Sequence, residues 1–434
     1  MIRARHRHKY HPWWPVLIPI ALILASEYKL RSRAASESIG GGVDATILLE
    51  VGVYGVVALY LYRRFGIGAP RRRPSSIRLL TWGWTAYSAL SVLWTPFPAF
   101  AAVRAVQLLI IAAVCQVMIS RADREDLWRL AHAFIVLVVV SVGIGVAMPF
   151  PRTPLTADRF NWLYVHPVTA GIFLGIAILL IAGFVLPGGP PRSWPLSAYL
   201  VAAAILVAAL IGTGTRGAAG GCLAGLAVMC WLARGTRGRV MFLMIAVPAA
   251  IVAGLAFTDR LVGFATRGES VEQLETLNAR TDLWTFALRA FETEPFFGNG
   301  LSSTRGLFLD EMGLGGGHNA FVNVLVEGGV VGLVLFCMLA LALMVRLVTL
   351  TRLRHIRTEA AMLLGLMVFF AVDGITTETV AAPANVDSVW LFVVIAWTII
   401  LARQPAADET RSVAGGVTNA PELPPDAASP EVVR

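Results

Sequence analysis

The segment Thr213-Gly-Thr-Arg-Gly-Ala places Arg216 in a short break between two apolar runs. Such a turn at a helix N-terminus suits an arginine that binds phosphate, because the backbone N–H groups, the helix dipole and the bidentate guanidinium all favour an anion. The alternative is a turn residue or a contact with lipid headgroups. Polar side chains at membrane depth are mostly functional, so we expect Arg216 to bind an anion.

His318 stands at the start of a long apolar run, after Gly315-Gly-Gly and directly before Asn319. A histidine at a helix N-terminus, next to a bound anion, suits general-base catalysis. The alternative is a capping or interfacial histidine. Asn319 is predicted to be the N-cap of the following helix, since asparagine favours that position.

A third basic side chain, Arg280, opens the segment Arg280-Thr-Asp-Leu-Trp284. The polar loop around it, residues 258–319, contains nine acids and five arginines. The loop is therefore no general basic patch, and any anion binding must come from specific arginines. The alternative for Arg280 is an exposed helix cation that pairs with a nearby acid.

Three more basic residues are candidates. Arg159 and His166 flank the aromatic residues at positions 160, 162 and 164, which are typical of an interfacial belt and equally suited to line a sugar or lipid groove. Arg104 lies early in an apolar run, where an unpaired arginine costs about 3 kcal/mol or more, so we expect a partner. Asp373 and Glu327 are candidate partners, although helix packing is the simpler interpretation for Glu327.

The composition shows which elements must position these residues. Of 434 residues, 57% are hydrophobic and 15% are charged, well below the quarter that is typical of soluble proteins. This excludes a disordered protein, a disulfide-stapled secreted module and a soluble nucleic-acid binder. The net charge of +9 is best explained by positive loops on the cytoplasmic side of a membrane. No set of His, Asp or Glu has metal-ligand spacing, and no nucleotide-binding motif is present.

Hydropathy predicts an all-α integral membrane protein with about twelve transmembrane helices. The first span follows an arginine-rich N-terminus and is expected to remain uncleaved. The predicted spans are 12–28, 43–62, 78–94, 101–119, 129–148, 167–187, 196–213, 217–234, 239–257, 320–345, 359–377 and 386–402. Glycines at 217, 221 and 225 repeat every four residues, which predicts close packing against another helix.

The distribution of Lys and Arg predicts that both termini are cytoplasmic. The large loop 258–319, between the ninth and tenth spans, then lies on the outer face, and loops of that length are usually functional. Within it, helical spacing predicts an amphipathic helix that ends near Pro295. Its apolar positions are Leu274, Leu277, Trp284, Leu288 and Phe291. The polytopic domain is expected to cover residues 1–402, and residues 403–434 are expected to be a disordered cytoplasmic tail.

Several short motifs occur in an order that resembles one known family. They are Leu90-Ser-Val-Leu-Trp-Thr-Pro96, Thr213-Gly-Thr-Arg-Gly217, Arg280-Thr-Asp-Leu-Trp284, Pro295-Phe-Phe-Gly-Asn-Gly300 and Gly317-His-Asn319 followed by Glu327-Gly-Gly. Together they resemble the superfamily of O-antigen ligases and O-antigen (Wzy-type) polymerases, which includes exopolysaccharide polymerases. The resemblance covers residues 77–400 and is strongest over 210–335.

The resemblance implies a GT-C-like, multi-span glycosyltransferase of the bacterial cytoplasmic membrane, with its active site on the outer face. The donor would be an oligosaccharide on undecaprenyl pyrophosphate, and the reaction would invert the anomeric centre with no metal and no cofactor. The acceptor would be a second lipid-linked repeat unit in a polymerase and a lipid A core in a ligase. Some relatives glycosylate proteins, and partner proteins of polysaccharide assembly are a further class that the family allows.

By the same resemblance, Arg216 and Arg280 bind the leaving pyrophosphate and His318 activates or orients the acceptor hydroxyl. We take these three as candidate catalytic residues. The chemistry agrees, because a good leaving group leaves the protein mainly to place the substrates and stabilise negative charge. Further candidates, for substrate binding, are Arg104, Arg159, His166, Trp284 and Asn319.

Polymerase and ligase share these motifs, and we favour a polymerase because nothing in the sequence identifies a lipid A core partner. A transporter or flippase of lipid-linked glycans is the alternative from another class. It predicts charges along a central path, of which the sequence offers few. A structural membrane protein would leave the three candidate catalytic residues on one face unexplained.

Overall fold

The computed structural model describes residues 12–29, 44–66, 75–148, 159–235, 238–239, 244, 280–312 and 316–403. Over these residues the regular elements are all helices, as predicted. In chain order they are α1 (Trp14–Glu27), α3 (Ala45–Phe65), α4 (Ser76–Leu90), η1 (Ser91–Leu93), α5 (Pro98–Arg121), α6 (Arg124–Ala147), α7 (Pro167–Val185), α8 (Leu196–Gly212), α9 (Arg216–Ala233), α13 (Arg280–Thr293), α14 (Ser303–Met312), α15 (Ala320–Leu350), α16 (Arg357–Asp373) and α17 (Val386–Leu401).

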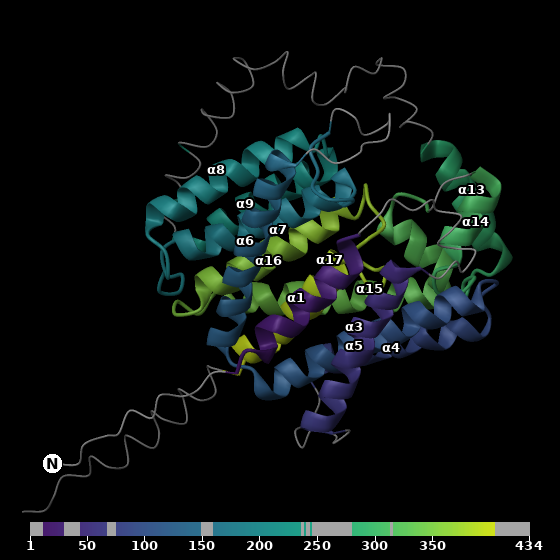
Figure 1. Cartoon of the computed structure of the whole chain (residues 1–434). Coiled ribbons are helices and arrows are strands. Elements are labelled where there is room, and N and C mark those ends of the chain that lie inside the picture. The colour runs from purple at the N-terminus through teal and green to yellow at the C-terminus, as the bar shows by residue number, and fades with distance from the viewer. Residues whose placement is uncertain are drawn as a thin grey trace, which may run out of the picture.

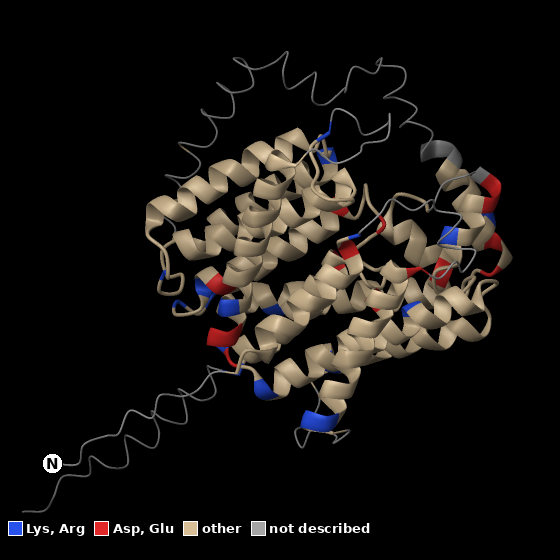
Figure 2. Cartoon of the chain, in the orientation of Figure 1, with Lys and Arg blue, Asp and Glu red and all other residues tan. Residues whose placement is uncertain are grey.

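Among the described residues, six helices are long and apolar enough to cross a membrane, namely α3, α5, α6, α7, α9 and α15. Three shorter helices, α1, α8 and α17, are also apolar. Every predicted span except 239–257 coincides with a helix, and that one lies largely outside the described residues. The predicted count of twelve spans is therefore not confirmed. Figure 2 shows that the helices carry few charged residues along most of their length.

Local sequence explains where many helices begin. Asp44 accepts a hydrogen bond from the backbone N–H of Ile47 at 2.9 Å, and so caps α3. Capping boxes start α6, at Asp123 and Asp126, and α17, at Asn385 and Ser388. Proline at the first turn opens α1, α5 and α7, where its missing N–H costs nothing. These helix starts follow from the sequence alone.

The core lies around α7, α16 and α17, which are buried along nearly all of their lengths. In Figure 1, α6 to α9 lie on one side of α16 and α17, and α3 to α5 lie on the other. The predicted close packing of the α9 glycines is confirmed, and the partner is α16. A Cβ at Gly221 would lie 3.0 Å from the Phe369 carbonyl oxygen, and one at Gly225 would lie 2.6 Å from that of Gly365.

α15 is interrupted at Gly329, whose φ of 60° and ψ of −164° are not helical. Residues 295–300 fill this interruption by backbone hydrogen bonds. The N–H groups of Asn299 and Gly300 donate to the carbonyls of Val326 and Glu327, each at 2.8 Å. In the other direction, the Val330 N–H donates to the Pro295 carbonyl at 2.9 Å. The close contact between the backbones of residues 295–300 and 326–330 thus explains why both segments contain glycines.

The segment 90–96 docks on the same unit. The Trp94 indole N–H donates to the carbonyl of Gly298 at 3.1 Å, and the Leu301 N–H donates to Ser91 Oγ at 2.8 Å. Tyr87, one turn earlier, donates to the Gly328 carbonyl at 2.7 Å. Three of the motifs behind the family resemblance therefore build one scaffold.

Candidate functional site

Arg216 begins α9 directly after a tight turn. α8 ends at Gly212, and Gly214 has a φ of 61°, a left-handed conformation that glycine adopts readily. The Thr215 N–H donates to Thr213 Oγ1 at 3.2 Å within the turn. The first N–H groups of a helix point outward at its N-terminal end, and Arg216 adds a half-buried basic residue there. This is the local geometry expected of an anion-binding turn.

Arg159 fixes that turn from outside. Its Nε donates to the Thr213 carbonyl at 2.7 Å, and its Nη2 donates to Thr215 Oγ1 at 3.1 Å. The Phe160 N–H also donates to the Gly212 carbonyl at 2.7 Å. The structure thus brings Arg159 next to Arg216, with part of its guanidinium engaged by the turn. Its predicted contact with substrate stays a prediction.

His166 is the N-cap of α7, and its Nδ1 accepts a hydrogen bond from the Val168 N–H at 3.2 Å. Although part of its surface is exposed, partial burial lowers the pKa of His166 from 6.5 to about 4, and the charges of Arg159 and His318 act in the same direction. His166 is therefore neutral at pH 7. The predicted belt or groove is wrong for Trp162, which is fully buried against Phe173 in the core.

His318 lies in an exposed bend with a φ of 48°, which is uncommon for a residue other than glycine. Its backbone N–H donates to Glu378 Oε2 at 3.4 Å. The predicted cap is confirmed, because Asn319 Oδ1 accepts from the N–H groups of Phe321 and Val322 at 2.9 and 3.1 Å. The amide oxygen of Asn319 is thus occupied by the helix that presents His318.

The turn after α16 connects Arg216 to His318. Its Gly374 carbonyl accepts from the Ala320 N–H at 2.8 Å, at the start of α15. On the other side, a Cβ at Gly217 would collide with the Thr376 hydroxyl and lie 3.1 Å from Asp373 Oδ1. Residues 373–378 therefore contact the first turns of both α9 and α15. The electrostatic effect of His318 on His166 places the start of α7 at the same end of the bundle.

Arg280 is the first residue of α13, and its side chain lies outside the described residues. Its convergence with Arg216 and His318 stays a prediction. Trp284, one turn later, packs beside a small cluster that joins α13, α14 and α15, namely Leu283, Ala287, Phe308 and Val326. Among the described residues the buried indole N–H of Trp284 has no hydrogen-bond partner.

The predicted amphipathic helix of the loop is confirmed over α13, and Leu274 and Leu277 lie outside the described residues. The packed face agrees with the prediction only in part: Trp284 packs beside the cluster, but Leu288 does not belong to it. Leu283 and Ala287 are buried, whereas Leu288 is 54% exposed. The reason is that α14, which the sequence analysis missed, and α15 offer Phe308 and Val326 to the Leu283 face.

Arg104 has a different partner from either candidate. Its Nη1 donates to Glu50 Oε1 at 3.2 Å, and Gln107 Nε2 donates to the same oxygen at 2.8 Å. The carboxylates of Asp373 and Glu327 instead accept from the nearby hydroxyls of Thr377 and Thr304. Lys29 completes the network by donating to Glu50 Oε2 at 3.0 Å. Arg104 is thus held between α3 and α5 by a buried carboxylate.

Three residues near the candidate site and Arg104 were not predicted from the sequence. Glu50 could have been found as an isolated acid in an apolar run. Arg305, on α14, lies within electrostatic reach of both Arg104 and Glu327. Glu378 follows two threonines and has no signal that relates it to His318.

The described residues contain no group of three or more His, Cys, Asp or Glu side chains that could hold a metal ion. What they do contain is two helix N-termini, basic side chains and buried carboxylates at one end of the bundle. This arrangement can bind an anionic group and move a proton at a nearby hydroxyl.

Comparison with known proteins found a family match for part of the chain. Residues 201–337 match the family described as O-antigen ligase. This segment runs from α8 into α15 and contains Arg216, Arg280 and His318. A search of curated proteins found no match. The match confirms the predicted resemblance to the superfamily of O-antigen ligases and polymerases over residues 201–337.

Proposed function

We propose that the protein is a glycosyltransferase that transfers or polymerises undecaprenyl-pyrophosphate-linked oligosaccharides at the outer face of the bacterial cytoplasmic membrane. The observation that carries this proposal is the turn 373–378, which contacts the first turns of both α9 and α15. Arg216 and His318, two of the three residues carried over from the family, are thereby at one end of the bundle. The family match at residues 201–337 supports the same class of substrate.

In the proposed reaction the acceptor hydroxyl attacks the anomeric carbon of the donor sugar. The bond from that carbon to the pyrophosphate oxygen breaks, and the lipid pyrophosphate leaves with its electron pair. Arg216 and the N-terminus of α9 stabilise the negative charge that develops on this oxygen, and Arg280 is proposed to join them. His318 accepts the proton of the attacking hydroxyl, and attack from the opposite face inverts the configuration.

The test uses purified protein, a labelled undecaprenyl-pyrophosphate oligosaccharide and EDTA, with products resolved by size. We expect a ladder of longer lipid-linked glycans from the wild type. Arg216→Ala and Arg280→Ala should each lose at least about 100-fold in rate, which is typical of removing one donor to a developing oxyanion. His318→Ala should do the same if this residue is the base.

Matched controls are Arg192→Ala and His355→Ala, which replace the same residue types at exposed positions at the other end of the helices. Both should keep wild-type rates. A ladder that survives in Arg216→Ala would contradict the proposal. Transfer only when a lipid A core or protein acceptor is added would assign a ligase, and bound substrate without any transfer would favour a flippase.

A further inference from the structure

A cavity of about 700 Å³ lies where α4 begins and where α15 and α17 end. Three arginines line it: Arg78, Arg346 and Arg403. None of the described residues that line it is acidic. Its volume is in the range of a site for a small organic ligand.

This cavity is separate from the candidate functional site. Asn319 caps the start of α15, whereas Arg346 lies near its end, and a helix of that length separates the two by about 40 Å. α17 likewise begins beside the turn 373–385 and ends at the cavity. The glycan chemistry proposed above therefore does not use these arginines.

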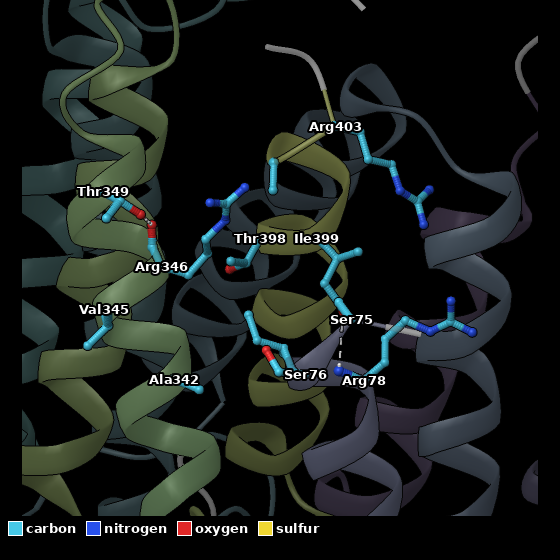
Figure 3. A pocket seen from close by; sticks show the side chains of 12 residues that line it. Ser75, Ser76, Arg78, Ala342, Val345, Arg346, Thr349, Thr398, Ile399 and Arg403 are labelled. Atoms are coloured by element: carbon cyan, nitrogen blue, oxygen red, sulfur yellow. Dashed lines mark hydrogen bonds between the residues drawn. The ribbon is translucent and has the colours of Figure 1, made fainter. Parts of the chain in front are cut away.

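The cation best placed for a ligand is Arg346. It is exposed on α15, and Figure 3 shows its guanidinium beside α17, on the opposite side from Arg78 and Arg403. Arg403 donates to the Ile119 carbonyl, and so part of it is engaged. Arg78 is only 8% exposed, and its buried Nε has no hydrogen-bond partner among the described residues. A lining with three arginines and, among its described residues, no acid favours an anionic occupant.

The lining changes from polar to apolar along α15. Thr349 and Arg346 lie at the end of the helix, and Val345 and Ala342 follow toward its middle (Figure 3). Val345 is 56% exposed, although it is apolar. A free phosphate would use only the polar end of this surface. A molecule with an anionic head and an apolar chain would use both ends.

We propose that this cavity binds an anionic phospholipid, with its phosphate at Arg346 and an acyl chain along Val345 and Ala342. Arg78 and Arg403 contribute positive potential at the end of α17. Basic pockets between membrane helices bind anionic headgroups, and each Arg near the headgroup contributes ~1 kcal/mol, or about fivefold in affinity. The site is a lipid site of this chain, independent of its glycan substrate.

Native mass spectrometry of the purified full chain in detergent tests the proposal, with dioleoyl-phosphatidylglycerol as the probe. Dioleoyl-phosphatidylcholine has the same chains without net charge, and inorganic phosphate has the charge without chains. We expect the anionic lipid to bind at least about fivefold more tightly than the zwitterionic one, and Arg346→Ala to remove about that factor. Ala342→Trp, which fills the apolar end, should weaken both lipids.

Arg352→Ala is the matched control, because Arg352 is an exposed arginine two residues beyond α15 and does not line the cavity. It should leave lipid affinity unchanged. Equal losses in Arg346→Ala and Arg352→Ala would show diffuse surface attraction and overturn the proposal. Displacement of the lipid by inorganic phosphate, together with unchanged lipid affinity in Ala342→Trp, would also overturn the proposal. The site would then bind only the anion.

Discussion

The imidazole of His166 lies near two other basic side chains, Arg159 and His318. Partial burial is the larger cause of its lowered pKa of about 4, and electrostatic interactions with Arg159 and His318 lower it further. Replacing Arg159 by Gln removes one cation and keeps the size of the side chain. We expect the pKa of His166 to rise toward 6.5 in Arg159→Gln, as measured by NMR titration of labelled histidine. Arg192→Gln, at the other end, should leave it unchanged.

The same shift gives a sign for the pH dependence of stability. As pH falls below 6.5, the unfolded chain binds a proton at His166 before the folded protein does. The stabilising contribution of His166 is therefore complete above about pH 6.5 and is lost as the pH falls toward 4. His166→Gln should flatten this part of the stability profile. An unchanged profile would contradict a lowered pKa.

The buried carboxylate of Glu50 accepts hydrogen bonds from three side chains: Lys29, Arg104 and Gln107. Removing the partner of a buried charge costs about 3–5 kcal/mol, whereas replacing the whole pair by apolar residues is often nearly neutral. We expect Glu50→Leu to lower the unfolding temperature strongly and Glu50→Leu with Arg104→Met to restore most of it. If the double variant is no more stable than Glu50→Leu, the unpaired charge of Arg104 is not what destabilises the single variant.

These residues differ in how far sequence could predict them. The cap at Asn319 depends on bonds to residues two and three positions away, so its position before an apolar run was sufficient. The pair of Glu50 and Arg104 joins residues 54 positions apart on different helices, and hydropathy carries no information on which acid an arginine meets. The contact between Glu378 and the backbone of His318 was hidden for the same reason.

The helices α9 and α16 approach each other at glycines. Ala in place of Gly225 would put its Cβ 2.6 Å from the Gly365 carbonyl oxygen, and neither backbone can yield easily. We expect Gly225→Ala to cost about 1–3 kcal/mol through overpacking. Gly220→Ala is the control on the same helix, because no atom lies within 4 Å of its Cβ. It should be neutral or gain up to about 1 kcal/mol in helix propensity.

The unfolding temperatures of the two variants in detergent test this expectation. A lower unfolding temperature for Gly220→Ala than for Gly225→Ala would contradict the packing of α9 on α16. The glycine spacing predicted this close contact from sequence, but it did not identify the partner helix. Similarly, the spacing in the loop predicted α13, whereas its packed face depends on Phe308 of α14.

The arrangement of the whole bundle could be predicted only in outline. Long apolar runs predict helices, because membrane interiors require backbone hydrogen bonds to be made within the segment. The scaffold of segments 90–96, 295–300 and 327–329 depends on hydrogen bonds from the side chains of Tyr87 and Trp94 to backbone carbonyls some 200 residues away. Hydropathy does not encode such contacts. The ordered motifs indicated that these segments matter, but not that they touch.

The proposed topology places α13 and the start of α15 on the outer side of the membrane and the end of α15 on the cytoplasmic side. The reason is electrostatic, because arginines retained on the cytoplasmic side gather after α15, at positions 352, 354 and 357. In a background without the four native cysteines, we expect Glu292→Cys on α13 to react with a membrane-impermeant maleimide in intact spheroplasts. Arg352→Cys should react only after permeabilisation. The reverse pattern would put His318 on the cytoplasmic side, away from any donor that has been flipped outward, and so would contradict the proposed function.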